Sequence, residues 1–172
     1  MALGFAAPTP VQAVTFADGS THFAEVPRLV NVATNKRAAG SLGPTYTFTL
    51  RVPVGATENL GRVVIQQIQG GDQVWYQNIH ELRIFEGTIR NQGRNFAIAA
   101  IDLNPINNTI VVDFDQTVPP GTTVTIALRP QRNPRSIGTY LFNIRAFPSG
   151  PKPAGQFVGT SRIEISERGR DR

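Results

Sequence analysis

Three stretches of the chain alternate between apolar and polar residues at nearly every position. They cover residues 46–52, 110–115 and 123–129. A period of two places one set of side chains on each face of a strand, which is typical of antiparallel sheets with one buried and one solvated face. The alternation therefore predicts an all-β protein, although it does not indicate a reaction.

The rest of the chain supports the same fold class. Thirteen Pro and sixteen Gly interrupt it, and no stretch keeps helical periodicity for several turns. About eight or nine strands are expected at spacings of roughly 10–15 residues. We predict an antiparallel two-sheet β-sandwich with an Ig-like, Greek-key layout and at most one or two short helical turns. One such turn is expected at residues 57–60, and a tight turn at Asn91-Gln92-Gly93.

The N-terminal segment differs from the rest in composition. Residues 1–13 read MALGFAAPTPVQA and carry no charge, and Val11-Gln12-Ala13 fits the small-x-small rule for cleavage after Ala13. The segment is either the remnant of a signal peptide that starts upstream of Met1 or a flexible leader. The predicted organisation is this leader, a single β-sandwich domain over residues 14–166 and a frayed charged tail over residues 167–172.

Charge and composition limit the partners. The net charge is +5, and only Lys36 and Lys152 among the 17 basic residues are Lys. For an exported protein we expect an anionic polysaccharide, a lipid headgroup or an acidic protein surface as partner, and no nucleic acid. The absence of Cys excludes disulfides and thiolate sites, and no apolar run is long enough for a transmembrane segment. The sequence leaves the oligomeric state open.

Residues suited to catalysis or metal binding are present but not in useful patterns. His22 and His80 have no metal-type spacing, and no G-x-S-x-G motif occurs. Asp113 and Asp115 share the solvated side of a predicted strand. Residues 102–108 offer oxygen ligands but lack the spacing of a calcium loop. We therefore predict no catalytic residue, no metal site and no cofactor.

Two polar clusters are candidates for binding. Arg129, Arg132 and Arg135 lie in a loop stiffened by two prolines, and they either form an anion- or partner-binding patch or pack down onto the end of the sandwich. Trp75 and Tyr76 are expected on opposite faces of a short strand over residues 74–78. An outward Trp75 among amide side chains would suit aromatic contact with a ligand, whereas the favoured interpretation places Trp75 in the core.

A family resemblance rests on eight segments taken as a set. In chain order they are residues 27–30 (PRLV), 46–50 (YTFTL), 85–88 (FEGT), 118–130 (VPPGTTVTIALRP), 132–134 (RNP), 140–142 (YLF), 146–148 (AFP) and 155–159 (GQFVG). Together they resemble a family of exported cyanobacterial proteins, domain of unknown function 2808. The resemblance implies a signal peptide and therefore export, and it implies no activity, so no catalytic residue is carried over.

The predicted function follows from these observations. We expect a non-enzymatic exported binding or structural module of the cell envelope or thylakoid lumen. Its expected location is the periplasm, the thylakoid lumen or the cell surface. It would engage an anionic partner through the Arg-rich loop. The alternative is a self-assembling subunit that adds a terminal strand, residues 14–16 or 156–166, to a neighbour's open sheet edge. A third interpretation is a hydrolase with an unrecognised site.

Overall fold

The computed structural model describes residues 14–15, 17–76 and 81–167, and over these residues the chain forms twelve strands and one 3₁₀ turn. The first sheet has the spatial order β3 (Arg28–Thr34), β4 (Tyr46–Arg51), β10 (Thr123–Leu128), β6 (Arg83–Thr88) and β7 (Asn91–Asn95). The second has the order β12 (Gln156–Ile165), β11 (Gly138–Pro148), β5 (Leu60–Gln69), β9 (Thr109–Val118) and β8 (Ile98–Asn104). A small ribbon joins β1 (Val14–Thr15) to β2 (Thr21–His22), and the 3₁₀ turn η1 covers Val54–Ala56.

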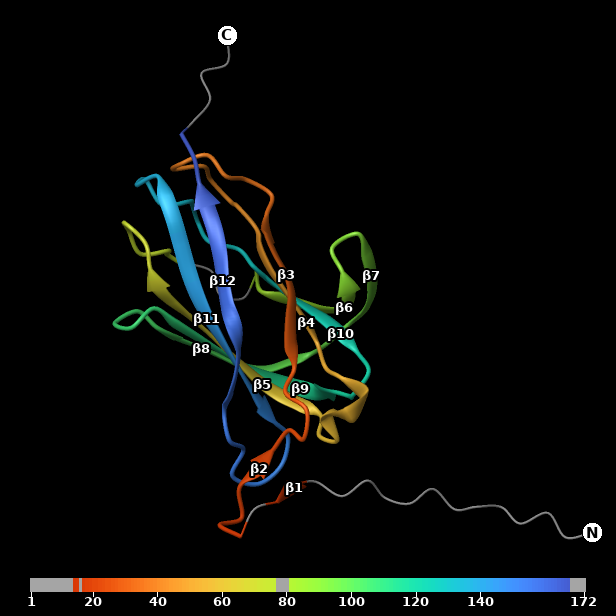
Figure 1. Ribbon diagram of the computed structural model, residues 1–172. Coiled ribbons are helices and arrows are strands. Elements are labelled where there is room, and N and C mark those ends of the chain that lie inside the picture. The colour runs from red at the N-terminus through yellow and green to blue at the C-terminus, as the bar shows by residue number, and fades with distance from the viewer. Residues whose placement is uncertain (1–13, 16, 77–80, 168–172) are drawn as a thin grey trace, which may run out of the picture.

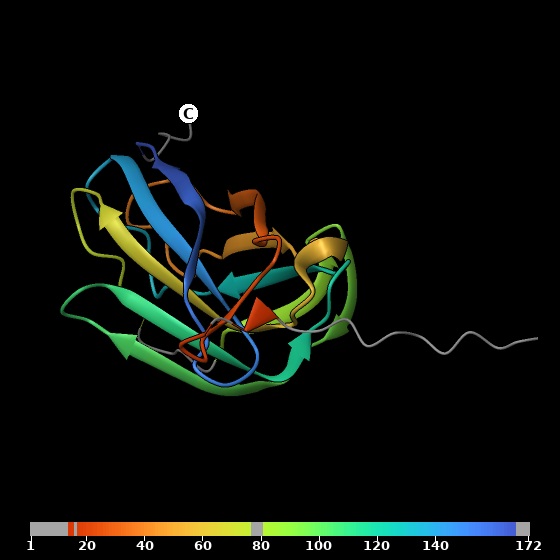
Figure 2. The ribbon, with the colours of Figure 1, turned by 60° about the horizontal axis from the view of Figure 1, so that its bottom comes forward.

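All strand pairs within the sheets are antiparallel, and the two sheets pack face to face (Figures 1 and 2). The edge strand β12 of the second sheet lies alongside the edge strand β3 of the first (Figure 1). The chain passes directly from β7 at the edge of one sheet to β8 at the edge of the other. The prediction of an all-β, two-sheet antiparallel sandwich is confirmed.

The core lies between the sheets and is built from the apolar half of each alternating strand. Phe48 on β4 and Phe142 on β11 are both fully buried, and their rings meet edge to face with centroids 5.8 Å apart. Tyr46 makes a second edge-to-face contact with Phe142, at 6.3 Å. Burying an aromatic or aliphatic side chain of this size contributes about 1.5–3 kcal/mol, so the period-two pattern supplies most of the driving force for the sandwich.

The helical turn occurs earlier in the chain than predicted. It covers Val54–Ala56, and Thr57, which was expected to begin it, follows its end with a φ of 64°. Pro53 precedes the turn in an extended conformation, with φ −62° and ψ 156°. The expected range of residues 57–60 is wrong, because Thr57 has a positive φ that ends the turn and β5 already begins at Leu60.

The expected turn at Asn91-Gln92-Gly93 is also wrong, since these residues belong to β7. Thr88 pairs with Asn91, so the hairpin closes through Ile89 and Arg90. The irregularity that allows this closure is at Gly87, where the register shifts and φ is 86°. A side chain at Gly87 would meet the carbonyl oxygen of Asn91, so only glycine fits there.

The strand register places three connections and the end of β12 at one end of the sandwich. Thr34, Tyr46 and Leu128 are aligned across the first sheet, so the β3–β4 and β10–β11 loops leave from the same edge. Residues 70–76 follow the end of β5 and reach the same place. The end of β12 also lies there, because Ser166 bridges to Ala38. This end is at the top of Figure 1, and β2 lies at the bottom. Among the described residues, no helix is long and apolar enough to cross a membrane.

Candidate functional site

Three loops meet at one end of the sandwich, and backbone hydrogen bonds tie them together. We call this surface the basic end and define it as residues 35–45, 70–76 and 129–137. The amide of Asn133 donates to the carbonyl of Ser41 (2.8 Å), and the amide of Gln131 donates to the carbonyl of Trp75 (3.1 Å). The middle loop is therefore held from both sides.

A buried side chain anchors the same loop to the core. Asn133 is fully buried, and its side-chain amide donates to the carbonyls of Lys36 (3.0 Å) and Ala38 (2.9 Å). Its Oδ1 accepts the hydroxyl of buried Tyr46 at 2.8 Å. Burial, followed by the nearby Tyr140, raises the pKa of Tyr46 above its ordinary value, so the hydroxyl keeps its proton and remains a donor. Asn133 thus connects the core, the β3–β4 loop and the Arg-rich loop.

Trp75 lies outside the core, so the favoured interpretation of an inward Trp75 is wrong. Its side chain is 60% exposed. Val74 is buried instead, with its amide donating to the side-chain oxygen of Gln67 at 2.9 Å. The predicted alternation of Trp75 and Tyr76 therefore holds, but with Tyr76 packed against the core. The expected strand over residues 74–78 is absent at 74–76, and residues 77–78 lie outside the described part of the chain.

The Tyr76 hydroxyl is turned away from solvent. It is buried, and it has no hydrogen-bond partner among the described residues. Burial is the main cause of a raised pKa for this phenol, with a smaller contribution from Tyr46. Of the two aromatic candidates, only Trp75 presents its side chain to the outside.

Trp75, Arg132 and Arg135 line one hollow of about 520 Å³ on the basic end. The remaining lining residues are Asp72, Gln73, Asn133, Pro134 and Ser136. Asp72 accepts the amide hydrogen of Ser136 at 2.7 Å. Hydrogen bonds from Ser136 lower the pKa of Asp72, and the nearby Arg135 charge lowers it further. Among the described residues, Arg132 and Arg135 form no ion pair with a carboxylate.

Arg129 is separated from the other two arginines. It forms an ion pair with Glu81 at 3.3 Å and lines a different hollow. The three arginines of the sequence pattern therefore do not share one patch: Arg132 and Arg135 lie together with Trp75, and Arg129 faces the outer surface of the first sheet. The sequence spacing did not reveal this division, because it depends on which neighbour each side chain meets after folding.

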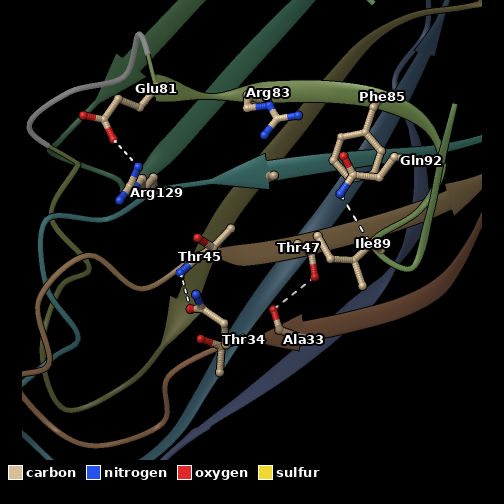
Figure 3. Close-up of a pocket in the computed structure, with 12 residues that line it drawn as sticks. Ala33, Thr34, Thr45, Thr47, Glu81, Arg83, Phe85, Ile89, Gln92 and Arg129 are labelled. Carbon is tan, nitrogen blue, oxygen red and sulfur yellow. Dashed lines mark hydrogen bonds and ion pairs between the residues drawn. The ribbon is translucent and has the colours of Figure 1, made fainter. Parts of the chain in front are cut away.

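The hollow beside Arg129, which we call the face groove, has a volume of about 430 Å³. Small side chains of neighbouring strands, Ala33, Thr47 and Ala127, form part of its lining. Figure 3 shows Arg83 and Phe85 on β6, with Ile89 and Gln92 contributed by the β6–β7 hairpin and Glu81 paired with Arg129. Phe85 is fully buried, so its ring is not available for stacking on a ligand. No pattern in the sequence pointed to this groove.

The acidic residues and the histidine considered as catalytic or metal-binding groups make local structural contacts instead. Asp113 pairs with Arg62 on the neighbouring strand, and Asn104 accepts the amide of Ile106 in an Asx turn. His22 lies 3.0 Å from the Ser20 hydroxyl, which also contacts Asp18 at 2.6 Å. In a catalytic triad the carboxylate orients the imidazole, whereas here it contacts the serine. No group of three metal ligands occurs within the described residues, and His80 lies outside them.

Comparison with the solved structure of BslA supports the sandwich fold. BslA, a bacterial hydrophobin, is 15% identical, with a TM-score of 0.52 over 85% of this chain and 98% of that one. The collagen-binding domain from a Staphylococcus aureus adhesin is 14% identical, with a TM-score of 0.37 over 72% of this chain and 87% of that one. The collagen-binding subdomain of the Enterococcus faecalis surface protein ACE is 12% identical, with a TM-score of 0.44 over 74% and 90%. The similarity to BslA concerns the fold and does not extend to function.

No curated protein sequence is significantly similar to this chain. The strands of both sheets, the loops of the basic end and the lining of the face groove all fall within residues 20–165. That range matches the family described as "Protein of unknown function (DUF2808)", and the chain belongs to this family.

Proposed function

We propose that this chain is a non-enzymatic binding module of the cell envelope that holds an anionic partner at its basic end. The observation that carries the proposal is the hollow in which exposed Trp75 lies beside Arg132 and Arg135, two guanidinium groups without an ion-pair partner in the described residues. Guanidinium groups bind carboxylate, sulfate and phosphate with paired donors, and an exposed indole adds a flat apolar contact.

The distribution of charge supports this choice of surface. The loops of the basic end carry five basic residues, Lys36, Arg37, Arg129, Arg132 and Arg135, and one acidic residue, Asp72, which gives +4. The loops at the other end, residues 17–27, 52–59, 89–90, 119–122 and 149–155, carry Asp18, Glu25, Glu58, Arg90 and Lys152, which gives −1. The field of such a molecule would turn its basic end toward an anionic surface.

The hollow is also rigid before a partner arrives. Pro130 and Pro134 are buried, and Asn133 between them is anchored to Tyr46. A loop that is already ordered loses little conformational entropy on binding. We propose export to the periplasm, thylakoid lumen or cell surface, for which residues 1–13 are the support in the chain itself.

Removal of the two arginines of the hollow tests the site. We expect Arg132→Ser/Arg135→Ser to weaken retention on a sulfated polysaccharide column, with an affinity loss of roughly five- to thirtyfold from two exposed charge contacts. The control is Arg51→Ser/Arg90→Ser, which removes the same charge from exposed positions away from the basic end. Equal elution of the two double variants would show that net charge alone causes retention, and the proposed site would be wrong.

A second candidate function is self-assembly by strand addition. It is favoured by the position of β12 at the edge of the second sheet, with Phe157 on this strand 58% exposed. The other terminal segment considered, β1, is already paired with β2. Light scattering over a range of concentrations tests the idea. If β12 adds to a neighbour's sheet, mass should rise with concentration and Phe157→Arg should suppress the rise; a constant monomer mass would exclude it.

A further inference from the structure

We propose that the anionic partner is a lipid bilayer, and that the basic end docks on it by inserting Leu42, Trp75 and Ile137 between anionic headgroups. The inference rests on the function proposed above, because it uses the same surface and names the partner. It is carried by the apolar side chains of this end, which an account based on charge alone leaves unexplained.

Each of the three loops exposes one large apolar side chain. Leu42 is 63% exposed, Trp75 60% and Ile137 56%. They lie on one connected surface, since Leu42 pairs with Arg132 across an isolated bridge, and Gln131 is bonded to the carbonyl of Trp75. Ile137 follows Ser136, whose amide is held by Asp72 in the same hollow. Exposed apolar side chains gathered in this way typically mark an interaction surface.

Basic groups surround these side chains. The ammonium group of Lys36 donates to the carbonyl of Leu42 at 2.7 Å, so a cation is held next to an exposed leucine. Arg132 and Arg135 flank Trp75 in the hollow, and exposed Arg37 follows Lys36. Proteins that lie on membranes combine apolar side chains that enter the boundary of the acyl region with Lys and Arg at the level of the phosphates.

The apolar side chains favour a bilayer over a polysaccharide. A sugar chain could stack on Trp75 and pair with the arginines, but it offers no apolar volume for Leu42 and Ile137. Indole rings are enriched where headgroups meet acyl chains, and a bilayer can accept all three side chains at once. The loops of the opposite end carry a net charge of −1 against +4 for the basic end, so an anionic membrane would attract the basic end and orient it toward the bilayer.

The position of the single tryptophan makes the inference directly testable. Trp75 is the only Trp in the chain, so tryptophan fluorescence, excited where the three Tyr do not absorb, reports on the basic end alone. We expect a blue shift on vesicles of phosphatidylcholine with phosphatidylglycerol, and quenching by lipids brominated near the headgroup. Phosphatidylcholine alone should give neither effect, and added salt should weaken both. Leu42→Ser/Ile137→Ser should lower vesicle affinity by roughly tenfold or more through lost apolar burial.

A matched control keeps the test specific. Val30→Ser/Val54→Ser removes two exposed apolar side chains outside the basic end and should bind vesicles like the unaltered chain. If the polysaccharide column separates Arg132→Ser/Arg135→Ser from its control while vesicles bring no blue shift and no quenching, the bilayer is wrong and the anion site stands. If Leu42→Ser/Ile137→Ser binds vesicles as tightly as the unaltered chain, the proposed insertion of these side chains is also wrong. If the column does not separate Arg132→Ser/Arg135→Ser from its control, and vesicles cause neither a blue shift nor quenching, the proposed function itself is wrong.

Discussion

Replacing Phe142 with Ala should lower the free energy of unfolding by about 3–5 kcal/mol, the usual cost of truncating a buried aromatic side chain. Phe142 is 1% exposed and lies at the middle of β11. Its ring contacts Phe48 and Tyr46 of the opposite sheet edge to face, so the truncation opens a cavity between the two layers. Urea denaturation followed by fluorescence or circular dichroism measures the loss.

The same substitution on the neighbouring strand provides the control. Phe157 on β12 is 58% exposed, so Phe157→Ala removes the same atoms without creating a cavity and should change stability by about 0.5 kcal/mol or less. The difference between the two losses in free energy of unfolding is more informative than either value, because both variants lose the same side chain. Equal losses would mean that the sheets do not pack through Phe142.

Strands such as β11 are the part of the fold that local sequence can specify. Apolar residues recur at every second position of this strand, at Tyr140, Phe142, Ile144 and Ala146, and all four are buried in the observed β11. A period of two leaves little choice of buried face, since a shift by one residue would expose every apolar side chain. The fold class therefore follows from the alternation alone.

Turns and short segments were harder to predict than strands, because contacts outside the segment determine their conformation. The hairpin closes through Ile89 and Arg90, which are not typical turn residues, because the bulge at Gly87 sets the register and moves Asn91-Gln92-Gly93 into β7. The direction of Trp75 was wrong for a similar reason. Val74 packs inward with its amide held by the Gln67 side chain at the end of β5, and this contact, which no local pattern indicates, sets the direction of the residues that follow.

The candidate site was predictable only in its parts. Arg132 and Arg135 were selected from spacing, and Trp75 from its polar neighbours, but nothing in the sequence showed that they would line one hollow. Their association depends on two loops that are far apart in the chain, residues 70–76 and 129–137, which are joined by the bonds from Gln131 to Trp75 and from Ser136 to Asp72. Asn133 in turn anchors the second of these loops to the core and to the β3–β4 loop. A single Asn between Arg132 and Pro134 gives no local signal of this role, because its partners lie nearly ninety or more residues away.

Asn133→Ala should therefore affect both stability and binding. It would leave the buried Tyr46 hydroxyl and the part-buried carbonyls of Lys36 and Ala38 without their partner, at a cost of about 2–4 kcal/mol. It would also loosen the middle loop, which would keep only its backbone bonds to the β3–β4 loop. We expect weaker retention on the polysaccharide column at a temperature where the variant is still folded, although Arg132 and Arg135 are unchanged.

Two further variants distinguish the specific role of the Asn133 side chain from the effect of removing any Asn side chain. Asn143→Ala removes a solvent-facing Asn that accepts the Thr160 hydroxyl at 2.7 Å, and should cost about 0.5 kcal/mol or less with no change in retention. Tyr46→Phe removes only the partner hydroxyl, and its effect should be less than additive with Asn133→Ala because both break the same bond. The contrary outcome is that Asn133→Ala lowers the free energy of unfolding no more than Asn143→Ala does, or leaves retention on the column unchanged. Either result would mean that the backbone bonds between the loops, and not the Asn133 side chain, maintain the shape of the basic end.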